Sequence, residues 1–364
     1  MLEVYGHGGD VESAALRYGL APGQFTDFSA NINPLGPPPG MLDALRAALP
    51  EIIRYPDPGH RALLSLLAER QGVQQAAICV GNGAAEIMAL ILLALTPSKV
   101  GVVQPCFSEY ETLSRQFGAE VHAIYGTAER DYRAEPEQIV KLIADSDLVF
   151  LGQPNNPNGV QYNVEQLRRF AEAGERHDTY IVLDEAFIDF IPAERRQSLL
   201  PELWRYPHVI IVRSMTKFYA IPGLRLGYGI AHPQMAAAMR NKQVTWSVNI
   251  LALRAGEISL QAGPEYETAT ISAIAGERKL LSAELERLGC EVTPGEANYL
   301  LLRLAEPWTA EAMQEALGRR GVLVRSCAMY PGLDAGHIRV AVKDRAANAV
   351  LIREMEQVMG GVQK

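Results

Sequence analysis

The chain has 364 residues, which is too long for one small core and suits a large domain with a smaller one beside it. Of its residues 48% are apolar and 21% are charged, so it is expected to be globular, neither disordered nor built for a membrane. Lys and Arg total 34 against 42 Asp and Glu, a net charge of −8. An acidic chain without a basic run is a poor binder of nucleic acid or of an anionic membrane.

The cysteines and the start of the chain indicate a compartment. The four cysteines lie far apart and form no C-x-x-C pair, which indicates reduced thiols rather than a disulfide or zinc framework. Residues 1–10 contain neither a basic nor an apolar stretch, so no secretion signal is expected. The longest apolar run, 87–95, is about half of what a bilayer span needs. The sequence therefore predicts a cytoplasmic protein with no metal, no nucleic-acid partner and no membrane contact.

Up to about residue 245, short apolar segments alternate with helical patterns. Residues 1–40 end in a Gly- and Pro-rich stretch and are predicted to form an arm with little regular structure that joins the smaller domain. Helices are predicted over 41–49 and 62–69, and a third begins near Ala84. The predicted strands are 77–80, 100–103, 147–151, 179–183 and 209–213. Continuously apolar strands separated by helices indicate a mostly parallel sheet with helices on both faces, so the fold class is α/β and 41–245 form the large domain.

After about residue 235 the pattern changes to long helices, predicted over 236–261 and 269–288. Strand-like segments follow, with one helix between them and another at the end of the chain. These segments are 299–302, 322–325 and 337–342. The pattern predicts a smaller α+β domain over 246–364.

The most informative segment is 212–228, which reads VRSMTKFYAIPGLRLGY. Lys217 comes just after a predicted strand, beside the hydroxyls of Ser214 and Thr216, and Arg225 follows eight residues later. A lysine that forms a Schiff base must be held and readily deprotonated, and neighbouring cations or a dry pocket lower its pKa. Ser214 and Arg225 can together grip a phosphate. An ordinary surface loop is the alternative, and the GLRLG frame around Arg225 argues against it.

Three further segments follow predicted strands. Gly83 and Ala84, in GNGAAE, open a helix whose N–H groups can hold a phosphate, although any tight strand-to-helix turn favours glycine. Asp184, in IVLDEAF, ends a strand at the sheet edge where ligands bind in α/β folds. A buried carboxylate there needs a cation, such as a protonated pyridine nitrogen; a helix cap is the alternative. Asn156, in QPNNPNG, can direct its amide to a cofactor oxygen or belong to a generic turn.

In this order the motifs resemble the aspartate-aminotransferase-like (fold type I) superfamily of pyridoxal-phosphate enzymes, over nearly the whole chain. The resemblance implies pyridoxal 5'-phosphate as cofactor, Lys217 as its covalent lysine and Asp184 as the partner of its pyridine nitrogen. It also implies a homodimer, because Tyr55, in RYPD, is similar to the tyrosine that reaches the phosphate of the neighbouring subunit. The other implied cofactor contacts are Ser214, Thr216, Arg225, Gly83 and Ala84 at the phosphate, Asn156 at the phenolic oxygen, and Phe107 and Phe187 near the ring.

Two branches of the superfamily compete, the threonine-phosphate decarboxylases and the histidinol-phosphate aminotransferases. Four segments are similar to the decarboxylase branch: HGG at 7–9, DFSANINPLG at 27–36, DEAFIDF at 184–190 and WSVN at 246–249. Phe187 stands where most aminotransferases have a tyrosine that donates to the cofactor, although a phenylalanine can also merely fill apolar space. The resemblance therefore implies decarboxylation of L-threonine O-3-phosphate to (R)-1-amino-2-propanol O-2-phosphate for cobalamin biosynthesis. The alternative is 2-oxoglutarate-dependent transamination of histidinol phosphate.

The substrate is expected to be a small phosphorylated amino acid. The resemblance implies that Arg339, in HIRV, binds its carboxylate, with Asn156 nearby. A phosphate dianion needs convergent cations and donors. The residues expected at the substrate phosphate are His7, Ser29, Asn33 and Arg325. For Arg325 the alternative is a surface charge on a strand, and for His7 a residue of a mobile arm.

Overall fold

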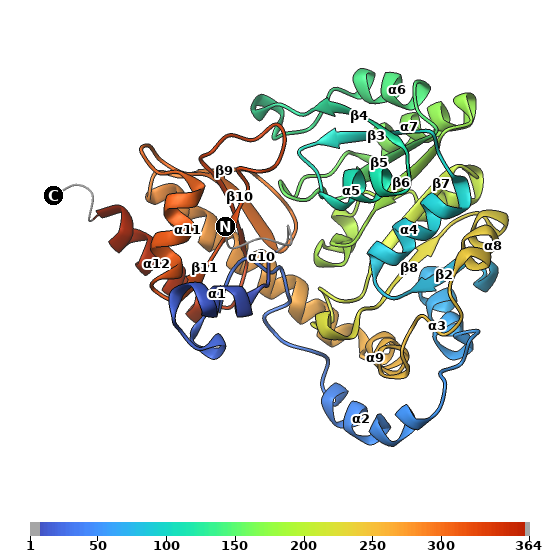
Figure 1. Cartoon of the computed structure of the whole chain (residues 1–364), viewed down its shortest axis with the longest axis horizontal. Coiled ribbons are helices and arrows are strands. Elements are labelled where there is room, and N and C mark those ends of the chain that lie inside the picture. Colours follow the sequence, from blue (N-terminus) through green and yellow to red (C-terminus); the bar gives the residue numbers. More distant parts are fainter. Residues whose placement is uncertain (1–7, 361–364) are drawn as a thin grey trace.

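The structure, a computed structural model, describes residues 8–360 and places a large sheet beside a smaller one (Figure 1). The large sheet has seven strands in the order β2-β8-β7-β6-β5-β3-β4. Every strand is parallel to the others except β8, which runs antiparallel to β2 and β7. The strands are β2 (Ile78–Gly81), β3 (Lys99–Gln104), β4 (Glu120–Tyr125), β5 (Leu148–Gly152), β6 (Tyr180–Asp184), β7 (Val209–Ser214) and β8 (Gly227–Ile230). The predicted α/β fold is confirmed, and β4 and β8 are strands that we did not predict.

Helices cover both faces of this sheet because successive residues of a strand point to opposite sides. In β5, Leu148 and Phe150 pack into one core, whereas Val149 and Leu151 pack into the other. The first core includes residues of α4 (Ala84–Leu95), α5 (Glu109–Gln116) and α8 (Pro233–Lys242). The second includes residues of α2 (Met41–Ala48), α3 (Arg61–Gln71), α6 (Pro136–Ala144), α7 (Val164–His177) and α9 (Ile250–Gln261).

The smaller sheet is antiparallel, with the order β12-β13-β10-β9. Its strands are β9 (Glu291–Val292), β10 (Tyr299–Arg303), β12 (Arg325–Ser326) and β13 (His337–Ala341). Its helices are α10 (Gly263–Arg287), α11 (Ala310–Gly318) and α12 (Arg345–Gly360). In Figure 1 the long helix α10 extends from α9, beside the large sheet, to the smaller sheet.

The N-terminal arm contains more regular structure than we predicted. Helix α1 (Val11–Tyr18) begins where the Asp10 carboxylate accepts a hydrogen bond from the Ser13 N–H at 3.0 Å, and it ends at Gly19, which has φ 68°. The arm then forms β1 (Thr26–Asp27), which pairs in parallel with β11 (Val322–Leu323). The arm therefore lies beside α11 and α12 in Figure 1, although these helices are far from it in the sequence.

The single helix predicted over 236–261 is wrong, because the chain leaves helical geometry between α8 and α9. Trp246 adopts a left-handed conformation with φ 62°, and the Asn249 side chain accepts the Ala252 N–H at 2.8 Å to begin α9. Helix α9 packs against α2 and α3. Residues 250–261 thus contact the large domain, although we assigned them to the small one.

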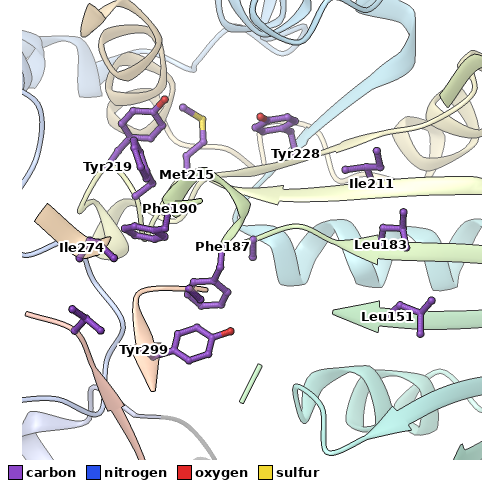
Figure 2. Close-up of a cluster of buried hydrophobic side chains, with 14 of the residues drawn as sticks. Leu151, Leu183, Phe187, Phe190, Ile211, Met215, Tyr219, Tyr228, Ile274 and Tyr299 are labelled. Carbon is purple, nitrogen blue, oxygen red and sulfur yellow. The ribbon is translucent and has the colours of Figure 1, made fainter. Parts of the chain in front are cut away.

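The parallel strands bring their carboxyl ends to one edge of the large sheet, which is where ligands bind in open α/β folds. β6 ends at Asp184 and β7 at Ser214. Figure 2 shows the apolar cluster at this edge, where Phe187, just after β6, lies against Tyr299 of the small sheet. The residues that follow the strand ends therefore meet the face of the small sheet.

Three general features hold for the described part of the chain. None of the helices within residues 8–360 combines the length and the apolar character that a bilayer crossing requires. Over the same residues, the side chains of His, Cys, Asp and Glu form no group of three or more that could hold a metal ion. The four cysteines are buried and free.

Candidate active site

Lys217 is half-buried in the loop that follows β7. Its Nζ donates a hydrogen bond to Ser214 Oγ at 3.0 Å. Burial lowers the pKa of Lys217 to about 8; Asp184 opposes this change, and Arg225 and Arg339 add to it. A lysine with this pKa keeps a substantial neutral fraction at mildly alkaline pH, as a nucleophilic amine requires.

Asp184 is 7% exposed at the end of β6. Its Oδ2 accepts a hydrogen bond from the Tyr110 hydroxyl at 2.6 Å, and its Oδ1 accepts the Ala186 N–H at 3.1 Å. Burial raises the pKa of the Asp184 carboxyl, against the effects of Tyr110, Lys217 and the Ala186 N–H. Our sequence analysis missed Tyr110. The available signal was its position three residues after Phe107, in the same strand-to-helix turn.

A candidate anion site lies where α4 begins. Gly83 has φ 90°, and a Cβ built on it would lie 2.8 Å from Arg225 Nη2, so the guanidinium rests against the glycine. Helix α4 starts at Ala84 with no side-chain cap, which leaves its first N–H groups directed outward. Arg225 is exposed and has φ 58°. A helix start and a guanidinium at one point favour a bound phosphate group.

Two buried hydroxyls, one on the last residue of β7 and one two residues later, lie next to this candidate anion site. Ser214 Oγ and Thr216 Oγ1 are 2.9 Å apart. Gly227, the first residue of β8, is paired with Ser214 on one side and with Gly81 on the other. A Cβ on Gly227 would lie 2.5 Å from the Ala84 nitrogen, so only glycine allows this approach. The structure therefore brings the predicted phosphate contacts together.

The small sheet contributes two arginines that face each other across a strand pair. Arg325 on β12 and Arg339 on β13 are directly paired, and they are 2% and 6% exposed. The alternative of a surface charge for Arg325 is therefore wrong. Arg339 Nη1 donates to Asn156 Oδ1 at 2.5 Å, and Nη2 donates to the Ser29 carbonyl at 2.9 Å. Like charges directly opposite on a sheet are unfavourable, so this pair indicates a site for anionic ligands.

A cavity of about 450 Å³ lies against Arg325. Gln104 and Cys106, from the end of β3 and the turn after it, line one wall. Met329 and Tyr330, from the segment after β12, line another. The cavity gives Arg325 room for a ligand group of phosphate size.

Aromatic rings surround the lysine and the arginine. The Phe187 ring lies edge-on to Tyr299, with 4.9 Å between centroids, and its centroid is 5.6 Å from Lys217 Nζ (Figure 2). The Arg339 guanidinium carbon is 5.3 Å from the centroid of Tyr299. Phe107 is half-buried and lies edge-on to another ring, that of Tyr110. Our sequence analysis also missed Tyr299, because it gave only a strand there.

Asn33 does not have the role that we predicted. Its Nδ2 donates to the Phe218 carbonyl at 2.8 Å, to the Tyr266 hydroxyl at 2.9 Å and to Thr270 Oγ1 at 3.0 Å. Its Oδ1 accepts the Leu35 N–H at 3.0 Å. The Asn33 amide thus fastens the arm to the rest of the molecule and has no donor left for a substrate phosphate.

Other predicted substrate and cofactor contacts fall into three groups. The Ser29 hydroxyl donates to Asp27 at 2.6 Å and accepts the Gly9 N–H at 2.8 Å, so Ser29 reaches the site through its carbonyl rather than its hydroxyl. His7 lies outside the described residues. Tyr55 is 77% exposed and stacks on Trp246, with 4.4 Å between centroids. Its ring is thus available to a neighbouring molecule.

The fold and this edge define a class of enzyme. Residues 23–354 match the family of class I and II aminotransferases, and the chain belongs to this family. It is 40% identical to the threonine-phosphate decarboxylase of Salmonella typhimurium strain LT2, over 98% of this chain and 97% of that protein. It is 32% identical to the histidinol-phosphate aminotransferase of Oleidesulfovibrio alaskensis, over 98% and 93%. The crystal structure of the histidinol-phosphate aminotransferase from Clostridium acetobutylicum, 32% identical, superposes with a TM-score of 0.85 and covers 92% of this chain and 99% of that one.

Proposed function

We propose that the chain decarboxylates L-threonine O-3-phosphate to (R)-1-amino-2-propanol O-2-phosphate and CO2 for cobalamin biosynthesis, with pyridoxal 5'-phosphate as cofactor. The observation that carries this proposal is the pairing of Arg325 with Arg339. A phosphorylated amino acid has two anionic groups, one for each guanidinium. The identity of 40% to a threonine-phosphate decarboxylase supports the same substrate.

The residues at the sheet edge fit pyridoxal phosphate. The start of α4, Arg225 and Ser214 suit its phosphate, the Asp184 carboxylate suits its protonated ring nitrogen, and Lys217 suits its aldehyde. When bound, the cofactor supplies an electron-poor ring that accepts the electron pair of a bond broken at the substrate α-carbon. The chain itself supplies the charges that hold the ring in place.

Arg325 and Arg339 determine which bond at the substrate α-carbon is broken. The bond at the α-carbon that stands perpendicular to the ring is the one that is cleaved, so orientation decides the reaction. Arg339 binds the carboxylate and Arg325 the phosphate, which fixes the substrate at two points. With the cofactor bound, this two-point binding by Arg339 and Arg325 would orient the substrate for loss of its carboxylate as CO2.

Lys217 moves the proton. With a pKa of about 8, its Nζ can hold a proton near neutral pH and release it. The α-carbon that has lost CO2 takes this proton in place of the carboxylate. Phe187 places an apolar ring, 5.6 Å from Nζ by its centroid, where most aminotransferases have a phenol. The missing donor supports decarboxylation over transamination.

A second copy of the chain completes the site. Tyr55 and Trp246 form an exposed stacked pair. Exposed apolar side chains precede each member of this pair in the sequence: Leu42, Leu49, Ile52 and Ile53 come before Tyr55, and Val244 comes before Trp246. We infer that the partner covers this surface and that the Tyr55 hydroxyl reaches the partner's cofactor phosphate.

We place the enzyme in the cytoplasm. Its four cysteines are free and buried. Free thiols persist in reducing compartments, whereas secreted proteins of this kind usually pair them.

The direct test is to incubate the purified protein, loaded with pyridoxal phosphate, with L-threonine O-3-phosphate and to measure CO2 and the phosphorylated amine. We expect both products in equal amounts, and a loss of at least about 10³-fold in Lys217→Ala because the proton donor is gone. Arg303→Met is the control. Arg303 lies on β10 of the same small sheet but pairs with the surface residue Asp334, so we expect this variant to keep the activity of the unmodified chain. Amino transfer from histidinol phosphate to 2-oxoglutarate without CO2 would assign the aminotransferase activity instead.

A further inference from the structure

Asp184 is buried, and a buried carboxylate stays ionised only when hydrogen bonds or opposite charges stabilise it. Within the described chain its hydrogen-bond donors are the Tyr110 hydroxyl, at 2.6 Å, and the Ala186 N–H, at 3.1 Å. Tyr110 is 1% exposed and comes from the first turn of α5, whereas Asp184 ends β6. The hydroxyl therefore reaches the carboxylate from a different element of the large domain.

The Tyr110 ring is held on two sides. It stacks on Phe150 with 5.1 Å between centroids and an interplanar angle of 7°. Phe107 packs edge-on against it, with 5.7 Å between centroids and an angle of 85°. Because the ring cannot turn away, its hydroxyl is fixed on Asp184 Oδ2, while the Ala186 N–H holds Oδ1.

We propose that Tyr110 is a positioning residue that keeps the Asp184 carboxylate ionised and aimed at the ring nitrogen of the cofactor. This inference rests on the proposed function. A hydrogen bond donated to a carboxylate favours its charged form. Phe187 lies beside Lys217, where most aminotransferases have a phenol. In this chain the Tyr110 phenol acts instead through the Asp184 carboxylate.

The other titratable groups near this pair do not replace Tyr110. Lys217 is the cation that faces Asp184 and lowers its pKa, but it must change its own charge during the reaction. Cys106 and Tyr299 lie near Tyr110, and burial raises the pKa of both, so they stay neutral. Tyr110 is therefore the side-chain donor whose effect on Asp184 does not vary through the reaction.

The test is Tyr110→Phe, which removes one oxygen and keeps the ring. We expect the Kd of the apoprotein for pyridoxal phosphate to rise about tenfold at pH 6, the effect of one lost hydrogen bond to a charged group. The difference should shrink towards pH 9, because the pKa of Asp184 is higher without the donor and more of the carboxyl is protonated on the acid side. A Kd ratio that is the same at every pH indicates a merely structural role and overturns the inference.

Tyr162→Phe is the matched control. Tyr162 is also buried, but its hydroxyl accepts the Ala134 N–H at 3.1 Å instead of meeting a carboxylate. We expect no pH-dependent change in Kd for this variant. In an Asp184→Asn background Tyr110→Phe should have no further pH-dependent effect, because no charge is left to stabilise.

Two measurements keep the inference testable in every case. In ¹³C-aspartate-labelled apoprotein, the Asp184 carboxyl should titrate at a higher pH in Tyr110→Phe than in the unmodified chain, and equal midpoints overturn the inference even where no cofactor binds. If Tyr110→Phe does not fold, 3-fluorotyrosine at position 110, a nearly isosteric and stronger donor, should lower that midpoint, and an unchanged midpoint again overturns the inference. Failure of the unmodified chain to bind pyridoxal phosphate contradicts the proposed function instead.

Discussion

The edge of the large sheet and the face of the small sheet handle buried charge in opposite ways. At the edge, Lys217 and Asp184 have opposite signs, and each opposes the effect of burial on the other's pKa. On the small sheet, Arg325 and Arg339 have the same sign and are directly paired. The first arrangement stabilises its own charges, whereas the second places two like charges against each other. Buried charges in the two regions are therefore under different electrostatic constraints.

On the small sheet, the Arg339 guanidinium already donates hydrogen bonds to two neutral acceptors. Arg339 donates to the Asn156 amide oxygen and to the Ser29 carbonyl. A charged acceptor makes a stronger hydrogen bond than a neutral one. A substrate carboxylate that displaces these partners would therefore form stronger hydrogen bonds with Arg339. Its negative charge would also offset the unfavourable pairing of the two arginines, and both effects would increase the affinity for substrate.

The strongest test of this comparison is Arg325→Met. We expect kcat/KM for threonine phosphate to fall by about 10² to 10³-fold, because a buried charged contact to the phosphate is lost. The free energy of unfolding of the ligand-free protein should stay the same or increase, since the like charge opposite Arg339 is gone. Initial rates and urea unfolding measure the two effects. A large loss of stability would contradict the view that these two like charges oppose each other in the ligand-free protein.

The next test breaks the anion site on the large sheet. Gly83→Ala places a methyl group against the Arg225 guanidinium at a residue with φ 90°. We expect the Kd for pyridoxal phosphate to rise about tenfold and stability to fall by about 1 kcal/mol from backbone strain. Gly118→Ala is the control, because Gly118 has φ 86° and nothing within 4 Å of its added methyl group. Equal effects of both variants on cofactor affinity would show that Gly83 acts only through its backbone.

The smallest effect is expected from Lys217→Met in the apoprotein. The pKa of Lys217 is about 8 when folded and 10.5 by its ordinary value, so the folded protein binds fewer protons between these values. The charged lysine therefore costs stability below pH 8, and this cost disappears as the pH rises above 10.5. We expect the variant to be more stable than the unmodified chain by about 1 to 2 kcal/mol at pH 7, allowing for partial solvent screening, and equally stable at high pH. Urea unfolding at several pH values measures this difference, and a variant that is less stable at pH 7 would contradict the low pKa.

Much of the sheet edge was predictable because its residues follow apolar strands directly. Asp184 ends β6 and Ser214 ends β7, and parallel strands place such residues together. The strand β8 escaped prediction because its sequence, GYGI, is short and contains two glycines, which are weak strand formers. The break before α9 escaped because the 243–249 segment is held by tertiary contacts, among them the hydrogen bond from Gln243 to the Val80 carbonyl.

The contacts that join distant segments could not be predicted from one sequence. Asn33 looked like a substrate contact, but its amide is used by Tyr266 and Thr270, more than 200 residues away. The partnership of Tyr110 with Asp184 crosses 74 residues and two elements. Local patterns indicate which residues end a strand, whereas such pairings depend on how whole elements pack.

The reversed direction of β8 has a consequence for how this protein can vary. Because β8 starts at the site edge, the loop of residues 215–226 leaves that edge and returns to it within one hairpin. Lys217 lies near one end of this loop and Arg225 near the other, so the spacing between the amine and the guanidinium is set by the number of residues in the loop. Insertions or deletions here would move one group relative to the other. Divergence of this enzyme should therefore proceed in the hairpin through exchange of side chains at constant length, while surface turns elsewhere remain free to grow or shrink.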